Sequence, residues 1–160
     1  MKRGTTLFLR LAVILIGLPV LALCIFVVPE IGDFVADLYP DKAYLEYLVF
    51  IDLYATAVPF YYALYHASKL LNYIDRNQAF SELSVGALKM IKYCAIIISI
   101  LYAAGMPLFY LMADADDAPG IIVVGLVMIF ASLVIAVFSA VLQRLLKDAI
   151  DIKAENDLII

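Results

Sequence analysis

The chain has 160 residues, of which 66% are hydrophobic and 16% are charged, and its formal net charge is −4 at pH 7. Soluble globular domains use only about 45–50% apolar residues, so this composition excludes an ordinary soluble domain. The segments between the apolar stretches are too short to form an independent soluble core. We therefore expect residues 1–160 to form one membrane domain.

Four apolar stretches follow one another along the chain, at 7–28, 44–67, 93–112 and 121–142. About 20 helical residues are needed to cross the hydrocarbon core of a bilayer, and each stretch is long enough. We predict an all-α polytopic membrane protein, with four transmembrane helices in an antiparallel bundle. The predicted helices cover about 7–28, 44–67, 88–112 and 121–142, with a loop at 68–87 and an amphipathic helical tail at 143–160.

Basic residues gather in three of the five segments outside the spans. These segments are the start of the chain, the central loop and the tail, and the two remaining loops hold only Lys42. Lysine and arginine are enriched on the cytoplasmic side of membrane proteins, which places both termini and the central loop in the cytoplasm of a bacterial cell. The two other loops are acidic and are expected outside the cell membrane.

Asp52 is the one acidic residue well inside an apolar span. Counting from the outer helix ends places it in one layer with Gly17, Tyr102 and Ser132, and we expect Asp52 to accept a hydrogen bond from Tyr102, Ser132 or both. Intramembrane acids are functional candidates because they are costly to bury. Three alternatives remain: an acid that locks helix packing, a proton or ligand site, and simple exposure at the interface.

The second span is also rich in tyrosine. Most of these rings fall near the two membrane surfaces, where amphipathic aromatic residues are common, but Tyr54 and Tyr61 do not. We therefore regard both as intramembrane polar candidates. His66 is predicted near the cytoplasmic end, too far from Asp52 for direct proton transfer.

The residue pattern does not indicate a metal site, a cofactor site or an enzyme active site. Cys24 and Cys94 are expected on opposite sides of the bilayer, and the chain has a single histidine. No cluster with metal-ligand spacing, pair of converging acids or phosphate-binding loop appears. We expect no metal, no cofactor, no catalytic residue and no enzymatic activity.

The fourth span carries small residues at a helical spacing, with Gly125, Ser132 and Ser139 seven positions apart. Membrane helices approach one another closely through such residues. The neighbour is either another helix of the same chain or a second copy in a homodimer.

Two segments on the cytoplasmic side carry specific motifs. The first is Asn72, Ile74, Asp75, Phe80 and Ser81, followed by Leu88 and Ile91, with Asn77 at the turn and Ser81 as the N-cap of the next helix. The second reads Ala149-Ile150-Asp151-Ile152-Lys153-Ala154-Glu155-Asn156-Asp157-Leu158. With these motifs the whole chain resembles the DUF2975 family of small bacterial four-span membrane proteins, whose function is uncharacterised. It departs from the family pattern at Asn77 and Ala79, where glycine and proline are frequent, and at Ile159, where threonine is frequent.

The resemblance implies a partner on the cytoplasmic side, because family members are often encoded beside a small helix-turn-helix regulator. It carries over no catalytic residue. The residues expected to bind a partner are those of the two motifs: Asn72, Asp75, Phe80, Ser81, Asp151, Lys153, Glu155, Asn156 and Asp157. We expect no direct binding of nucleic acid.

Two functions are compatible with these features. The first is a non-enzymatic sensor or regulatory partner that acts through its cytoplasmic loop and tail. The alternative is a small proton-coupled transporter, as a monomer or a dimer, that uses Asp52.

Overall fold

The computed structural model describes residues 3–42, 44–115, 117 and 119–159. These residues form the helices α1 (Arg3–Ala22), η1 (Leu23–Val27, a π-helix), α2 (Val28–Leu38), α3 (Tyr44–Asp75), α4 (Glu82–Ala115) and α5 (Gly120–Ile159). Four helical stretches are long and apolar enough to cross a membrane, with α1, η1 and α2 together making the first. The predicted all-α membrane fold is confirmed.

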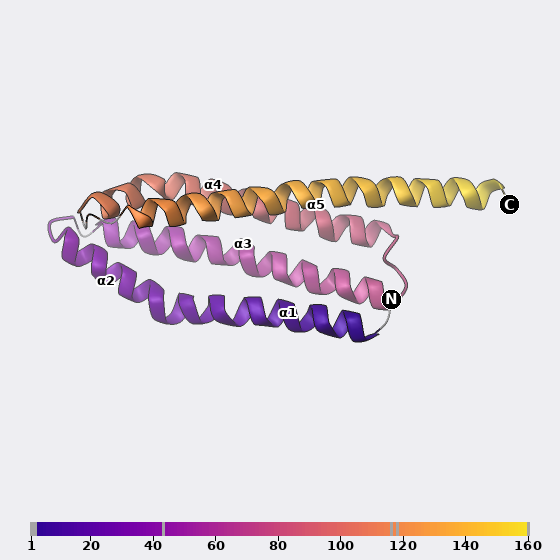
Figure 1. Cartoon of the computed structure of the whole chain (residues 1–160), viewed down its shortest axis with the longest axis horizontal. Coiled ribbons are helices and arrows are strands. Elements are labelled where there is room, and N and C mark those ends of the chain that lie inside the picture. Colours follow the sequence, from indigo (N-terminus) through magenta and orange to yellow (C-terminus); the bar gives the residue numbers. More distant parts are fainter. Residues whose placement is uncertain (1–2, 43, 116, 118, 160) are drawn as a thin grey trace.

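The helices run back and forth along one long axis (Figure 1). We call the end where α1 and α4 begin the basic end, and the opposite end, with the acidic loops, the acidic end. α3 packs against α1, α2 and α4, whereas α5 packs against α4 alone among the described elements. The bundle is therefore open between its first and last helices.

Two predicted boundaries differ from the observed helices. The first span does not end at 28, because η1 and α2 continue it to Leu38. Pro29 does not end this continuation: it lies in the first turn of α2, directly after the π-helical turn η1. The predicted loop 68–87 is mostly helical as well, which leaves only residues 76–81 between α3 and α4.

The short connection at the basic end is closed by a left-handed turn at Asn77, whose φ is 58°. The amide of Asn77 donates to the carbonyl of Ile74 at 3.2 Å, and the amide of Gln78 donates to Tyr73 at 2.7 Å. This pair of bonds is the Schellman motif, which ends a helix at a residue that tolerates positive φ. Asparagine fills that role here, so the predicted turn at Asn77 is confirmed.

At the acidic end, α2, α3 and α4 share a small apolar core. Val35, Leu45, Val49 and Met112 are its buried members. The hydroxyl of Tyr39 adds a hydrogen bond to the carbonyl of Leu111, with an O···O distance of 2.9 Å. These contacts fix the end of the first span against α3 and α4.

The small residues of α5 face α4. A Cβ added at Gly125 would lie 2.6 Å from Sδ of Met106 and 3.0 Å from Cδ2 of Phe109. Ser132, Ala136 and Ser139 are buried along the same helix. The close neighbour of this face is thus α4 of the same chain rather than a second copy.

Gly32 supplies a stability test, because α2 meets α3 there. A Cβ at Gly32 would overlap the ring of Phe50, with Cε1 and Cε2 both 2.7 Å away. We expect Gly32→Ala to destabilise the protein by about 1–3 kcal/mol, the usual cost of overpacking. The measurement is the thermal unfolding midpoint in detergent.

Gly86→Ala is the matched control, because a Cβ at Gly86 meets nothing within 4 Å. Removing a glycine from a helix interior is stabilising by roughly 0.5–1 kcal/mol, so this variant is expected to unfold at a higher temperature than the wild type. Equal midpoints for the two variants would contradict the close approach of α2 to Phe50.

Candidate functional site

Asp52 lies on α3 at the contact with α4. A Cβ added at Gly105 would stand 2.9 Å from Cγ of Asp52 and 3.2 Å from its Oδ1, so the carboxyl group rests on the α4 backbone. Its Oδ2 is buried and has no hydrogen-bond partner among the described residues. The carboxyl group of Asp52 is thus covered by α4 at Oδ2, and it forms no ion pair in the part of the chain that the structure describes.

The expected hydrogen bonds to Asp52 are not formed by either predicted donor. The hydroxyl of Ser132 instead donates to the carbonyl of Met128 at 2.8 Å, as serines within helices often do. Ser132 also lies on α5, whose backbone approaches α4 and not α3 among the described elements. Tyr102 and Asp52 are both described, and no hydrogen bond joins them.

The predicted layer is wrong for Gly17 as well. Gly17 lies beside Leu64 and Tyr61, about three turns further along α3 than Asp52. The prediction counted inward from residue 28, but the first span continues to Leu38. The extra turns of α2 shift every residue of α1 away from the acidic end.

Tyr54 and Tyr61 both act as hydrogen-bond donors to the first span. Tyr54 donates to the carbonyl of Cys24 at 3.0 Å, and Tyr61 donates to that of Gly17 at 2.7 Å. The π-helical turn explains the first bond, because the amide of Val28 bonds to Leu23 and residue 29 is a proline without an amide. The carbonyl of Cys24 thus lacks its helical donors, and Tyr54 replaces them.

His66 is separate from Asp52, as the sequence spacing predicts. Its ring packs edge-on against Tyr62 and Tyr65, at centroid distances of 4.6 and 5.4 Å. Its Nε2 is buried without a hydrogen-bond partner in the described part of the chain. These contacts do not link His66 to Asp52 by hydrogen bonds among the described residues.

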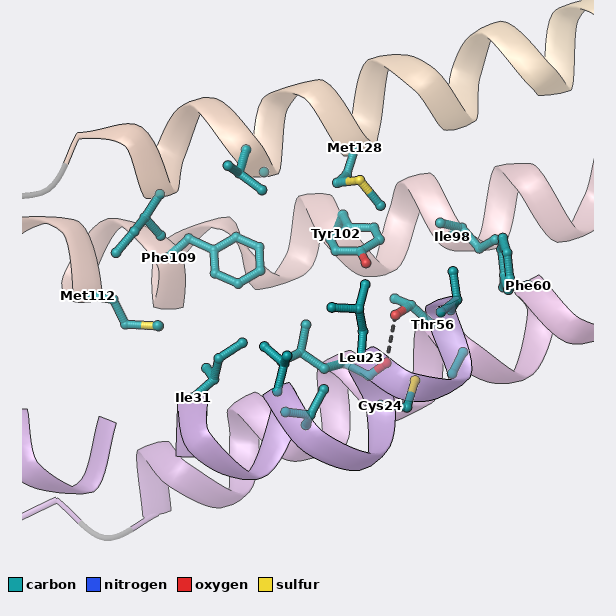
Figure 2. A pocket seen from close by; sticks show the side chains of 18 of the residues that line it. Leu23, Cys24, Ile31, Thr56, Phe60, Ile98, Tyr102, Phe109, Met112 and Met128 are labelled. Carbon is teal, nitrogen blue, oxygen red and sulfur yellow. Dashed lines mark hydrogen bonds between the residues drawn. The ribbon is translucent and has the colours of Figure 1, made fainter. Parts of the chain in front are cut away.

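A cavity of about 520 Å³ fills the open side of the bundle near the acidic end. Figure 2 shows side chains from η1, α2, α3, α4 and α5 pointing into it. It is lined by Val20, Leu23, Cys24, Val27, Val28, Ile31, Phe34, Leu53, Thr56, Ala57, Phe60, Ile98, Tyr102, Phe109, Met112, Ile121, Val124, Gly125 and Met128. The volume lies within the range of about 300–1,000 Å³ that is usual for small-molecule sites.

The cavity is almost wholly apolar. The hydroxyl of Thr56 on its wall is engaged with the carbonyl of Leu53 at 2.7 Å, and the hydroxyl of Tyr102 lies beside the same space (Figure 2). Sequence reasoning singled out Tyr102 but missed the cavity, because its walls come from helices that are distant in the chain. Such an environment suits a hydrocarbon group better than a charged one.

At the basic end, two of the motif residues bind α1. Arg10 Nη2 donates to Oδ1 of Asn72 and lies 2.8 Å from Oδ2 of Asp75. Asn72 and Asp75 therefore tie the end of α3 to α1. The sequence did not indicate this contact, because Arg10 is more than 60 residues away from both; their predicted binding of a soluble partner stays a prediction.

The rest of the first motif lies in the connection to α4. Phe80 is 61% exposed, and Ser81 immediately precedes α4, at its predicted N-cap position. The hydroxyl of Ser81 donates to the carbonyl of Gln78 at 2.5 Å. Phe80 is thus the member of this motif that is best placed for contact with another molecule.

The residues of the second motif lie at the end of α5, which projects past the other helices (Figure 1). Every residue from 151 to 158 is exposed. This set includes the predicted partner-binding residues Asp151, Lys153, Glu155, Asn156 and Asp157. No group of three or more metal-binding side chains occurs among the residues that the structure describes.

Four long apolar helices, with an apolar cavity between them and a polar helical extension at one end, define an integral membrane protein. The family model for DUF2975, described as a protein of unknown function, matches residues 30–160. The chain is also 70% identical over 158 residues to the uncharacterised membrane protein YoaS of Bacillus subtilis (strain 168), covering 99% of both chains. The chain belongs to the DUF2975 family. No solved structure matches it.

Tyr54→Phe tests the role assigned to the tyrosine hydroxyl. Removing it leaves the carbonyl of Cys24 without a donor inside an apolar span, and a polar group left unsatisfied in apolar surroundings costs about 1–3 kcal/mol. We expect a lower unfolding midpoint in detergent. Tyr62→Phe is the matched control, because no hydrogen bond of the Tyr62 hydroxyl is found in the described structure; an equal loss in both variants would refute the assignment.

Proposed function

We propose that this protein is a non-enzymatic sensor or regulatory partner in the bacterial cell membrane. In this proposal both termini and the basic end lie in the cytoplasm, as the distribution of lysine and arginine indicates. The connection between α3 and α4 and the tail of α5 bind a soluble protein. The family resemblance favours a helix-turn-helix regulator as that protein.

The observation that carries the proposal is the exposed end of α5. Ile152 and Leu158 are 66% and 85% exposed, and they lie among charged residues beyond the end of the bundle. α5 continues straight past the ends of the other helices (Figure 1), so a membrane that surrounds the bundle leaves these side chains outside it in this proposal. In this proposal Ile152 and Leu158 supply apolar contacts to the partner, and the charged residues around them supply polar contacts.

α5 also supplies a route from the membrane to this surface. The same helix forms one wall of the cavity, from Ile121 to Met128, and continues without a break into the tail. No proline interrupts α5 between Gly120 and Ile159, so the helix has no proline kink at which the two parts could move separately. A change in the position of α5 beside the cavity would therefore change the position of the tail, which is the basis of the sensing role.

Ile152→Ala tests the binding role of the tail without shortening it. Burying an isoleucine side chain stabilises a complex by about 1.5–3 kcal/mol, so its loss should weaken partner binding roughly tenfold or more. The measurement is the amount of soluble protein recovered with the tagged membrane protein after cross-linking in native cells, together with expression of the regulator's target genes.

Deletion of the residues after Lys147 should abolish recovery of the partner, and Ala154→Ser serves as the conservative surface control. Unchanged recovery and unchanged gene expression after the deletion would overturn the proposed function. Recovery of a soluble protein that binds equally well to Ile152→Ala would exclude Ile152 as a contact.

Proton-coupled transport by Asp52 is the second candidate, as a monomer or a dimer. It is favoured by the buried Oδ2 atom, which has no hydrogen-bond partner among the described residues and is free to carry a proton. Asp52→Asn keeps the size of the side chain but cannot exchange that proton. We expect it to abolish proton-coupled flux in vesicles if this function holds, and unchanged flux would exclude it.

A further inference from the structure

The cavity on the open side of the bundle is elongated along the helices. Its lining on α4 extends from Ile98 to Met112, a distance of about 21 Å for 14 helical residues. On the first span the lining extends over the same number of residues, from Val20 to Phe34. The cavity thus runs parallel to the helix axes, from the acidic end to the middle of the bundle.

The side of the cavity between the first span and α5 opens toward the surrounding membrane. No Cα atom of α1, η1 or α2 lies within 8 Å of a Cα atom of α5 in the described structure, apart from near neighbours in the chain. Leu23 and Val124, on opposite sides of this gap, are 51% and 63% exposed. Because these residues belong to membrane-spanning helices, the medium that meets the opening is hydrocarbon.

Water is a poor occupant of this space. Apolar cavities stay dry unless several polar groups surround the water, and the hydroxyl of Thr56 is already bonded to Leu53. Lipid chains, in contrast, lie roughly parallel to transmembrane helices and reach about 15 Å into the hydrocarbon core of roughly 30 Å. The cavity has the direction and the chemistry of one such chain, and its lining of about 21 Å is long enough to hold it.

We propose that this cavity binds one acyl chain of a phospholipid from the leaflet at the acidic end, which enters sideways between η1 and α5. The chain takes the place of the helix contact that is missing between the first span and α5, and it gains dispersion contacts with both walls. This proposal deepens the proposed function by naming the signal, but the binding site itself does not require the tail to have a partner.

Occupancy of the cavity sets the spacing of its two walls. A bound chain holds the first span and α5 apart, and without a chain close packing favours their approach. The π-helical turn η1 forms part of the wall that has to move, and α5 forms the other. The position of the tail thereby depends on whether a lipid chain is bound.

Neighbouring residues of α3 provide a matched pair of variants. Ala57 lines the cavity, whereas Val58 is 71% exposed on the outside of the bundle. Ala57→Phe fills the cavity with a ring, and Val58→Phe places the same ring in the membrane. Full-length protein is purified from vesicles of dipalmitoyl phosphatidylglycerol, and the lipid retained by each chain is counted by native mass spectrometry.

We expect the wild type and Val58→Phe to retain one phospholipid per chain and Ala57→Phe to lose it. Equal retention by both variants, a wild type without bound lipid, or retention of a molecule that is not a phospholipid would each overturn the proposal. Thermal unfolding of both variants verifies that they are folded.

A second variant keeps the test decisive if Ala57→Phe does not fold. Ile98 lies at the deep end of the cavity, so Ile98→Trp should shorten it and shift retention from dipalmitoyl to dilauroyl phosphatidylglycerol in a mixture of the two. An unchanged ratio would contradict the chain site. Deletion of the residues after Lys147 should leave lipid retention unchanged, which separates failure of this proposal from failure of the proposed function.

Discussion

Hydrocarbon offers no hydrogen-bond partner to the main chain, so every carbonyl within a bilayer must find a donor inside the protein. The first span meets this constraint in an unusual way. Its π-helical turn and Pro29 together remove both possible helical donors for the carbonyl of Cys24, and the hydroxyl of Tyr54 on α3 replaces them. The irregular span is therefore stable only beside α3, and the position of α3 determines where the cavity wall stands.

The helices of the bundle differ in how closely they pack, and this difference produces the cavity. α4 and α5 approach closely through small residues, and α4 also packs along α3. The first span contacts α3 through two tyrosine hydroxyls, an apolar core at the acidic end and the Arg10 interactions with Asn72 and Asp75. The gap left between the first span and α5 is a direct result of this arrangement.

The number and approximate position of the spans follow from the sequence because they depend on local composition. The turn at Asn77 and the helical tail are equally local, and they too agree with the structure. The predicted hydrogen bonds to Asp52 failed because α2 extends the first span and because α5 lies against α4 alone. The cavity and the role of Arg10 depend on contacts between residues that are far apart in the chain. A single sequence does not show which distant residues are in contact.

The loose attachment of the first span has a consequence for assembly of the protein in the membrane. During synthesis this span precedes α3 in the chain and must reside among lipids before its tyrosine donors have been made. Most of its side chains remain lipid-facing even in the finished bundle, so little changes for them when α3 arrives. The main chain at η1 does change its surroundings when α3 arrives, because the carbonyl of Cys24 has no donor until Tyr54 is in place. The π-helical turn that borders the cavity therefore gains its last hydrogen bond only after α3 has entered the membrane and packed against the first span.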